Sequence, residues 1–115
     1  MENYRNEITV NSKPKTINSK LKVLLIEDNS ADARLVQEIL HEVGSSAMDV
    51  EWADRLSTGL QRAADGGIDA VLLDLSLPDS HGLETFARTH AQAPHLPIIV
   101  LSGLADEALA VKAVA

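Results

Sequence analysis

The apolar residues of this chain fall into two kinds of segment that alternate along the sequence. Residues 70–73 and 98–101 are continuous apolar runs, residues 21–26 form another with Lys22 as its one polar member, and residues 48–52 give a weaker strand pattern. Short unbroken runs are typical of strands that are covered on both faces of a sheet. We therefore predict four strands at these positions, with Trp52 as a packing residue at the end of the second.

Segments with helical spacing separate these runs. The first begins after Asn29 or Ser30, either of which can cap a helix, and keeps one face apolar through Leu35, Val36, Ile39, Leu40 and Val43. A second helix is predicted after Asp54, a plausible cap, and ends at the glycine pair 66–67. A third helix carries Leu83, Phe86 and Ala87, and a fourth is expected to begin in residues 105–115.

Strands that alternate with helices of this length imply a parallel sheet with helices on both faces. Right-handed crossovers leave few topologies, and the leading one is a flavodoxin-like, doubly wound α/β sheet of strand order 2-1-3-4. Residues 1–20 are polar and lack lasting periodicity, so we expect a flexible leader there and a single domain over residues 21–115.

Three acidic residues directly follow predicted strands. Glu27 and Asp28 end the first strand, and Asp74 ends the third. In a sheet of this order the first and third strands are neighbours, and ligands bind at the carboxyl ends where the strand order reverses. Carboxylates gathered there repel one another unless a cation compensates, and Mg²⁺ prefers oxygen ligands. We predict a Mg²⁺ site beside Asp74, whose carboxylate can attack phosphorus as a nucleophile.

The fourth strand brings a hydroxyl to the same rim. Ser102 follows that strand and could donate to a phosphoryl oxygen, while Gly103 lets the backbone approach closely. Each acid alone has a simpler interpretation as a helix cap or a solvated turn residue, and Asp28 could cap the first helix. The combination of the acids and the hydroxyl, each after an apolar strand, indicates a functional site.

These residues resemble the receiver domain of bacterial response regulators. The matching segments are LKVLLIEDNSADARLVQEIL, DAVLLDLSLPDSHGLETF and LPIIVLSG. Pro78 and Gly82, four and eight positions after Asp74, fall at the places where the family has residues that shape the loop. The resemblance extends over roughly residues 20–115.

The resemblance implies a phosphoacceptor with Mg²⁺ as its cofactor. Asp74 would accept a phosphoryl group from the phosphohistidine of a histidine kinase or a phosphotransfer protein. Asp28, Asp74 and the backbone carbonyl of Ser76 would bind the ion directly, and Glu27 would act through water.

The resemblance also assigns residues to the switch. Ser102 would turn inward to contact the phosphate together with Gly103. Ser76 and Leu104 correspond to variable positions that influence how long the phosphate survives.

One part of the family pattern is not found in the sequence. A receiver continues through a fifth strand, which carries a phosphate-binding lysine and a switch aromatic, and a fifth helix, whereas the sequence given reaches Ala115 in or just after the predicted fourth helix. Lys112 is interpreted as a solvated surface residue. The apolar edge of the strand at 98–101 would then be open to pairing, and we expect a second copy or leader residues 8–10 to cover it.

Charge and composition exclude several classes of function. Residues 1–22 carry five basic against two acidic side chains, and residues 23–115 carry five against fifteen. Because residues 23–115 are strongly acidic, they repel the phosphate backbone of nucleic acids, and we do not expect the domain to bind nucleic acid directly. No cysteine is present, and no apolar segment resembles a signal peptide or could span a bilayer, which favours a cytoplasmic protein.

The sequence is compatible with three functions. The first is the phosphoacceptor module of two-component signalling, which switches a partner or an output domain and is not a multiple-turnover enzyme. The second is a pseudo-receiver that associates with partners without phosphorylation, which the missing lysine favours. The third is a phosphohydrolase that uses Asp74, but it would need an acid–base aspartate two residues later, where the chain has Ser76.

Overall fold

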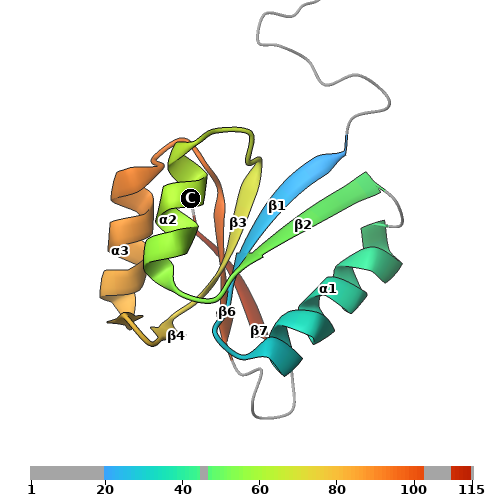
Figure 1. The fold of residues 1–115 in the computed structure, drawn as a ribbon, viewed down its shortest axis with the longest axis horizontal. Helices are drawn as coiled ribbons and strands as arrows, with labels where there is room; N and C mark the ends of the chain where they lie inside the picture. The colour runs from blue at the N-terminus through green and yellow to red at the C-terminus, as the bar shows by residue number, and fades with distance from the viewer. Residues whose placement is uncertain (1–19, 45–46, 103–109, 115) are drawn as a thin grey trace, which may run out of the picture.

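The computed structural model of the chain describes residues 20–44, 47–102 and 110–114. Strands and helices alternate through most of this length (Figure 1). In chain order the elements are β1 (Leu21–Ile26), α1 (Ser30–Gly44), β2 (Met48–Ala53), α2 (Leu56–Ala64), β3 (Ala70–Asp74), β4 (Ser76–Leu77), β5 (Ser80–His81), α3 (Leu83–Gln92), β6 (Ile98–Ser102) and β7 (Ala110–Val114).

The main sheet has the order β2-β1-β3-β6-β7, and its first four strands are parallel. Since β6 is the fourth of the predicted strands, the flavodoxin-like order 2-1-3-4 is confirmed. The register places Ile26, the last residue of β1, opposite Ala53 of β2 and Leu73 of β3. The carboxyl ends of these strands therefore finish at the same level, which fixes where the residues after them lie.

Two hydrophobic cores lie on the two faces of the sheet. Leu24 and Ile26 of β1 belong to the core that also contains residues of α2, whereas Val23 and Leu25 belong to the core that contains residues of α1. Successive residues of a strand point to opposite faces, so a continuous apolar run serves both cores. Figure 1 shows the strands between α1 on one side and α2 and α3 on the other.

The caps of the first two helices differ in origin. Asn29 caps α1 as predicted, because its Oδ1 accepts a hydrogen bond from the Asp32 backbone N–H at 2.9 Å. The prediction that Asp54 caps α2 is wrong, since Asp54 instead accepts a hydrogen bond from the side chain of the neighbouring Arg55. A carboxylate distant in the sequence takes over that cap, as described below.

The predicted helix at residues 105–115 is wrong for residues 110–114, which form β7. This strand pairs antiparallel with β6, with Ile98 opposite Val114 and Ser102 opposite Ala110. The apolar edge strand β6 presents N–H and C=O groups that can pair with another strand. Residues 110–114 contain two valines, and β-branched residues favour a strand over a helix. The edge of β6 is covered, but by this segment rather than by a second copy or residues 8–10, which lie outside the described residues.

No helix in the described part of the chain is long and apolar enough to cross a membrane.

Candidate functional site

The three acids that follow β1 and β3 lie together at the carboxyl end of the sheet. Oxygen atoms from Glu27, Asp28 and Asp74 all lie within 4.8 Å of one another. The register explains this proximity, because Ile26 is paired with Leu73 and the next residue of each strand is an acid. The convergence predicted from the sequence is therefore observed.

Glu27 is the buried member of the group, with 2% of its surface exposed. Its Oε2 accepts a hydrogen bond from the Asn29 backbone N–H at 3.1 Å, while its Oε1 is buried with no partner among the described residues. Burial, together with the charge of Asp74, raises the pKa of Glu27 to about 8, although the Asn29 hydrogen bond opposes the shift. A buried carboxylate oxygen without a donor is costly, and a cation would remove that cost.

Asp74 is half-buried at the end of β3. Burial raises its pKa, and the negative charges of Asp28 and Asp32 act in the same direction, while a hydrogen bond from the Ser76 backbone N–H opposes them. That hydrogen bond joins Ser76 N to Asp74 Oδ1 at 3.1 Å and holds one carboxylate oxygen in place. Asp28, by contrast, is exposed at the rim. The site thus combines two partly or fully buried carboxylates with one that faces solvent.

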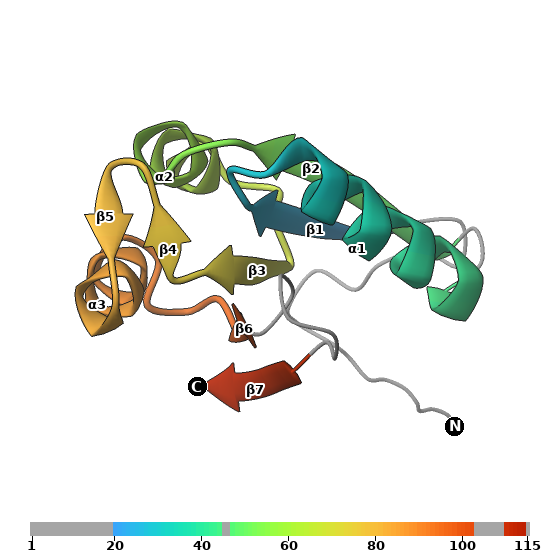
Figure 2. The same ribbon diagram turned by 90° about the horizontal axis from the view of Figure 1, so that it is seen from below.

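The loop after Asp74 forms a small hairpin that the sequence analysis missed. Strands β4 and β5 pair antiparallel, with Ser76 opposite His81, and Pro78 lies at the turn between them (Figure 2). Gly82 ends the hairpin with a φ of 69°, a region that favours glycine, and its N–H donates to the Leu75 carbonyl at 2.7 Å. The hairpin thereby holds the residues after Asp74 in a closed loop.

Asp79, at the tip of this hairpin, is a residue whose importance the sequence did not reveal. Its Oδ1 and Oδ2 accept hydrogen bonds of 2.9 Å from the backbone N–H groups of Leu56 and Ser57. Burial acts to raise the pKa of Asp79, but these hydrogen bonds outweigh it and the pKa is lowered. A proline–aspartate pair indicates a turn, yet nothing in the sequence shows which N–H groups the carboxylate meets.

The fourth strand reaches the same rim. Leu101 of β6 is paired with Asp74, so the backbone of Ser102 continues past the end of β3. Gly103 and Leu104 lie outside the described residues, and their roles stay predictions together with that of Ser102.

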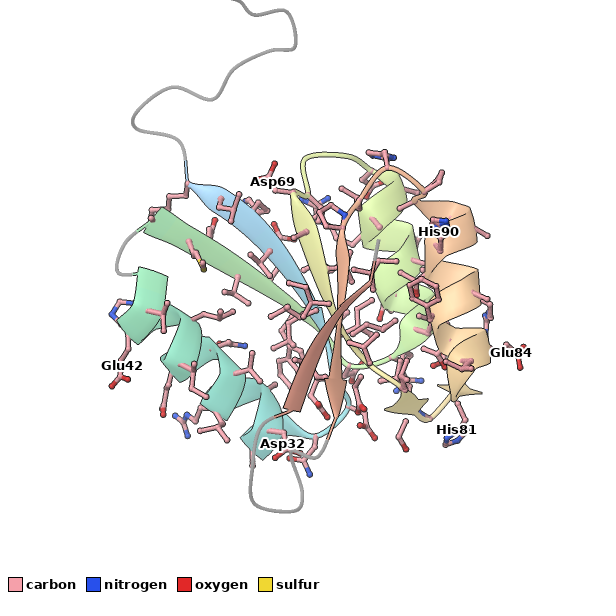
Figure 3. The ribbon with its side chains drawn as sticks, turned by 180° about the vertical axis from the view of Figure 1, so that it is seen from behind. Asp32, Glu42, Asp69, His81, Glu84 and His90 are labelled. Carbon is pink, nitrogen blue, oxygen red and sulfur yellow. The ribbon has the colours of Figure 1, made fainter. Side chains whose placement is uncertain are left out.

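The histidines, in contrast, do not gather at the acids. Figure 3 shows Asp32 and His81 toward the end where the parallel strands finish, and Asp69 at the opposite end of the sheet. Among the described residues, the group of three metal-ligating side chains contains only carboxylates. This donor set suits a hard cation rather than a transition metal.

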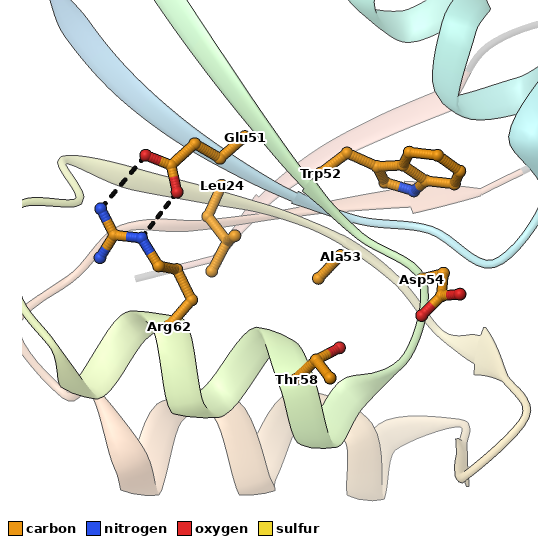
Figure 4. Close-up of a pocket in the computed structure, with 7 residues that line it drawn as sticks. All are labelled: Leu24, Glu51, Trp52, Ala53, Asp54, Thr58 and Arg62. Carbon is orange, nitrogen blue, oxygen red and sulfur yellow. Dashed lines mark hydrogen bonds and ion pairs between the residues drawn. The ribbon is translucent and has the colours of Figure 1, made fainter.

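A shallow groove of about 440 Å³ lies between β2 and α2 (Figure 4). Its charged residues are engaged with each other, because Arg62 donates to both oxygens of Glu51 at 2.6 and 3.2 Å. Arg62 lowers the pKa of Glu51 through these hydrogen bonds. Lys22 adds an ion pair of 3.2 Å to the same carboxylate. These contacts join α2 to the edge of the sheet and leave no free charge on Glu51 or Arg62 for a ligand.

Comparison with known proteins agrees with the arrangement of the acids. Residues 23–115 match the family model described as the response regulator receiver domain. The chain belongs to this family. The convergence of Glu27, Asp28 and Asp74 is thus found in a receiver domain of two-component signalling.

Curated relatives include a transcriptional regulatory protein and a cell cycle response regulator. The receiver domain is 40% identical over 85 residues to the KDP operon transcriptional regulatory protein KdpE of Escherichia coli, covering 74% of this chain and 36% of the relative. It is 35% identical over 85 residues to the cell cycle response regulator CtrA of Brucella ovis, covering 74% of this chain and 35% of the relative. The chain therefore spans about a third of the length of these relatives.

Solved structures show the same fold. A CheY-like response regulator receiver domain protein from Methanospirillum hungatei superposes with a TM-score of 0.62 at 27% sequence identity, covering 71% of this chain and 63% of that one. Receiver domains in general bind Mg²⁺, and the described part of this chain contains an acidic cluster of Glu27, Asp28 and Asp74.

Proposed function

We propose that this receiver domain is a phosphoacceptor that takes a phosphoryl group on Asp74 from the phosphohistidine of a histidine kinase or a phosphotransfer protein. The observation that carries the proposal is the convergence of Glu27 and Asp28 on Asp74, where Glu27 has a buried oxygen without a partner in the described structure. Membership of the receiver family supports it.

The residues present fit a bound Mg²⁺ ion. Mg²⁺ takes one or two carboxylates, keeps several waters and bridges to phosphate oxygens. We assign Asp28, Asp74 and the backbone carbonyl of Ser76 as direct ligands, and Glu27 as a ligand through water. When bound, the ion would compensate the carboxylate charges and those of an incoming phosphoryl group.

Asp74 is the nucleophile of the proposed step. One of its carboxylate oxygens forms a bond to phosphorus, the bond between phosphorus and the donor imidazole nitrogen breaks, and that nitrogen keeps the electron pair. The product is an acyl phosphate on Asp74. Because Ser76 N–H holds Oδ1 at 3.1 Å, we assign the attack to Oδ2. The domain supplies the nucleophile and the metal site for its own phosphorylation and is not a multiple-turnover enzyme.

Phosphorylation would change the charge of the rim. A phosphoryl group brings roughly −1.5 to −2 charges and three acceptor oxygens. Ser102 and Gly103 would contact it, and Ser76 and Leu104 would influence its lifetime. The resulting bias on the loops at this end of the sheet would pass to a partner or an output domain. We place this signalling in the cytoplasm, without direct nucleic-acid binding by the domain. Self-association through the edge of β6 is not proposed, because β7 covers that edge.

One observation favours a pseudo-receiver as the second candidate. In the described residues β7 runs antiparallel to β6, so a fifth parallel strand with a phosphate-binding lysine is not seen in this part of the chain. A domain of this kind would bind partners through the same fold without accepting phosphate.

Incubation with a small-molecule phosphodonor such as acetyl phosphate, with and without Mg²⁺, separates the two functions. Intact mass spectrometry is expected to show one added phosphoryl group in the wild type with Mg²⁺, and none in Asp74→Asn. Asp79→Asn removes another acid of the same loop and is expected to remain phosphorylatable. Unmodified wild-type protein, together with no binding of beryllofluoride and Mg²⁺, would favour the pseudo-receiver.

A further inference from the structure

Trp52 makes a contact that its predicted packing role does not require. It lies near the end of the edge strand β2 with 44% of its surface exposed. Its indole Nε1–H donates a hydrogen bond to the backbone carbonyl of Glu27 at 2.6 Å, across 25 residues of sequence. Leucine or phenylalanine would cover the same surface but would offer no donor, whereas indole is a donor only.

The contact completes a set of hydrogen bonds around the Glu27 backbone. The Glu27 N–H donates to the Ala53 carbonyl at 3.0 Å, which extends the pairing of β1 and β2 by one residue. Its carbonyl receives the Trp52 indole, and its side chain receives the Asn29 N–H at 3.1 Å. The backbone of Glu27 is therefore held on both sides, from β2.

The Glu27 carbonyl belongs to the peptide group that leads into Asp28. This group is planar, so the hydrogen bond that fixes its oxygen also fixes the direction in which the chain enters Asp28. Asp28 is the exposed acid of the cluster, and its oxygen lies within 4.8 Å of those of Glu27 and Asp74. A rotation of that peptide would carry the Asp28 carboxylate away from the other two.

We infer that Trp52 is a positioning residue for the cation site, which acts through the Glu27 peptide to hold Asp28 in place. The inference rests on the proposed function, because it assumes that the three carboxylates bind Mg²⁺. It assigns part of the metal affinity to a residue that does not touch the metal, and it places that residue on an exposed edge strand.

Trp52 lies outside the hydrophobic cores, so its side chain can be replaced without disturbing core packing. Trp52 lines the groove between β2 and α2 and also a groove of about 470 Å³ beside α1. Figure 4 shows Trp52 on the same strand as Glu51 but apart from the pair formed by Glu51 and Arg62. Neither hydrophobic core includes Trp52.

The experiment measures Mg²⁺ affinity by isothermal titration calorimetry in the full chain. The wild type is compared with Trp52→Phe and with a protein that carries 3-benzothienylalanine at position 52, in which sulfur replaces the indole N–H at nearly constant shape. Both are expected to bind Mg²⁺ about tenfold more weakly. This is the lower end of the effect of removing a hydrogen bond that orients a metal ligand. Incorporation of 5-fluorotryptophan, which keeps the N–H, is expected to restore wild-type affinity.

Leu35→Ala is the matched control, because Leu35 has the same exposed fraction of 44% and no place in the site. Unfolding by urea in the presence of a chelator shows whether each variant is folded at the temperature of the titration. A purely structural role of Trp52 would lower stability and leave the Mg²⁺ affinity of the folded protein unchanged.

The outcomes separate the inference from the proposed function. Equal affinity in the wild type and the benzothienyl protein overturns the role of Trp52 and leaves the metal site intact. Absence of Mg²⁺ binding in the wild type, with no difference from Asp28→Asn, overturns the proposed function and the inference together. In the metal-free protein, slow exchange of the Trp52 indole proton in NMR spectra is expected, and rapid exchange would contradict the hydrogen bond itself.

Discussion

Asp79 accepts a hydrogen bond of 2.9 Å from the backbone N–H of Leu56, 23 residues earlier in the chain. The second oxygen of Asp79 accepts another from Ser57. The first turn of α2 is thus capped by the hairpin that follows Asp74 rather than by a residue of its own segment. This contact joins two segments that are far apart in the sequence. The start of α2 is therefore stabilised by the loop after Asp74.

Asp79→Ala is expected to lower the free energy of unfolding by about 1–2 kcal/mol, the usual cost of losing a helix cap. Urea denaturation followed by circular dichroism measures it. Asp54→Ala is the matched control, since Asp54 lies next to α2 in sequence but bonds only to the neighbouring Arg55 side chain. Equal losses in the two variants would contradict the assignment of the cap to Asp79.

The same pair predicts a pH dependence. The pKa of Asp79 is lowered in the folded protein because its carboxylate accepts two backbone N–H groups, which outweigh the effect of burial. Its stabilising effect is therefore complete above its unfolded pKa of about 3.9 and is lost as the pH falls through the lower folded value. The difference in stability between the wild type and Asp79→Ala is expected to shrink in acid denaturation series below that pH.

Glu27 predicts the opposite dependence in metal-free protein. Burial raises its pKa from 4.5 to about 8, so the folded state keeps a proton that the unfolded state releases. The free energy of unfolding should then fall as the pH rises from about 4.5 and level off above about 8. Glu27→Gln, measured by urea denaturation with a chelator present, should flatten this fall, whereas Glu42→Gln, at an exposed position of α1, should not.

At neutral pH, Mg²⁺ should restore the free energy of unfolding that the wild type loses as Glu27 becomes ionised. The reason is that the ion binds the folded protein with its carboxylates ionised. At a free concentration of one hundred times the dissociation constant the gain is about 2.7 kcal/mol. In the metal-free wild type, a free energy of unfolding that stays the same between pH values of about 4.5 and about 8 would contradict the raised pKa of the buried Glu27.

Gly59 allows α2 to lie close to β1. A Cβ atom at this position would lie 2.8 Å from Cγ1 of Ile26, the residue that precedes Glu27. Gly59→Val is expected to cost about 1–3 kcal/mol of stability through overpacking, measured by thermal or urea denaturation. Helix propensity alone would favour valine over glycine, so a loss at this position points to the contact with Ile26. Gln61→Val places the same side chain at an exposed position of the same helix and is expected to cost only about 0.5 kcal/mol; a loss there as large as that of Gly59→Val would contradict the overpacking.

Ser80 and Thr85 form a buried hydroxyl pair, with their Oγ atoms 2.7 Å apart, that joins the hairpin to α3. Ser80→Ala leaves the Thr85 hydroxyl without this partner and is expected to cost about 1–3 kcal/mol. In the double variant with Thr85→Val both polar groups are absent, so the combined loss should be smaller than the sum of the single losses. A double-mutant cycle in urea measures this coupling, and strict additivity would show that the pair does not interact.

Much of the site could be predicted from residues that follow strands. The continuous apolar runs identified the four parallel strands, and the strand order then placed Glu27, Asp28 and Asp74 at one edge. The cap by Asn29 was also predictable, because a cap acts on N–H groups only two or three residues away. Such features depend on local spacing and on the few topologies that parallel sheets allow.

Other features depended on partners that no local pattern specifies. The cap of α2 by Asp79 and the contact of Trp52 with Glu27 each join residues more than twenty positions apart. Residues 110–114 were expected to continue a helix, yet they pair with β6 because that strand offers an apolar edge. Secondary-structure propensity is weak when an unpaired edge lies nearby, and tertiary context overrides it.

The chain's own pattern of apolar runs and acids thus determined the fold class and the meeting of the carboxylates. Only the tertiary structure decided which groups hold those carboxylates in place and how strongly burial disfavours their charge. The physical reason is that strand order follows from local hydrophobic patterning, whereas hydrogen bonds between distant segments and the desolvation of Glu27 arise once the segments have packed.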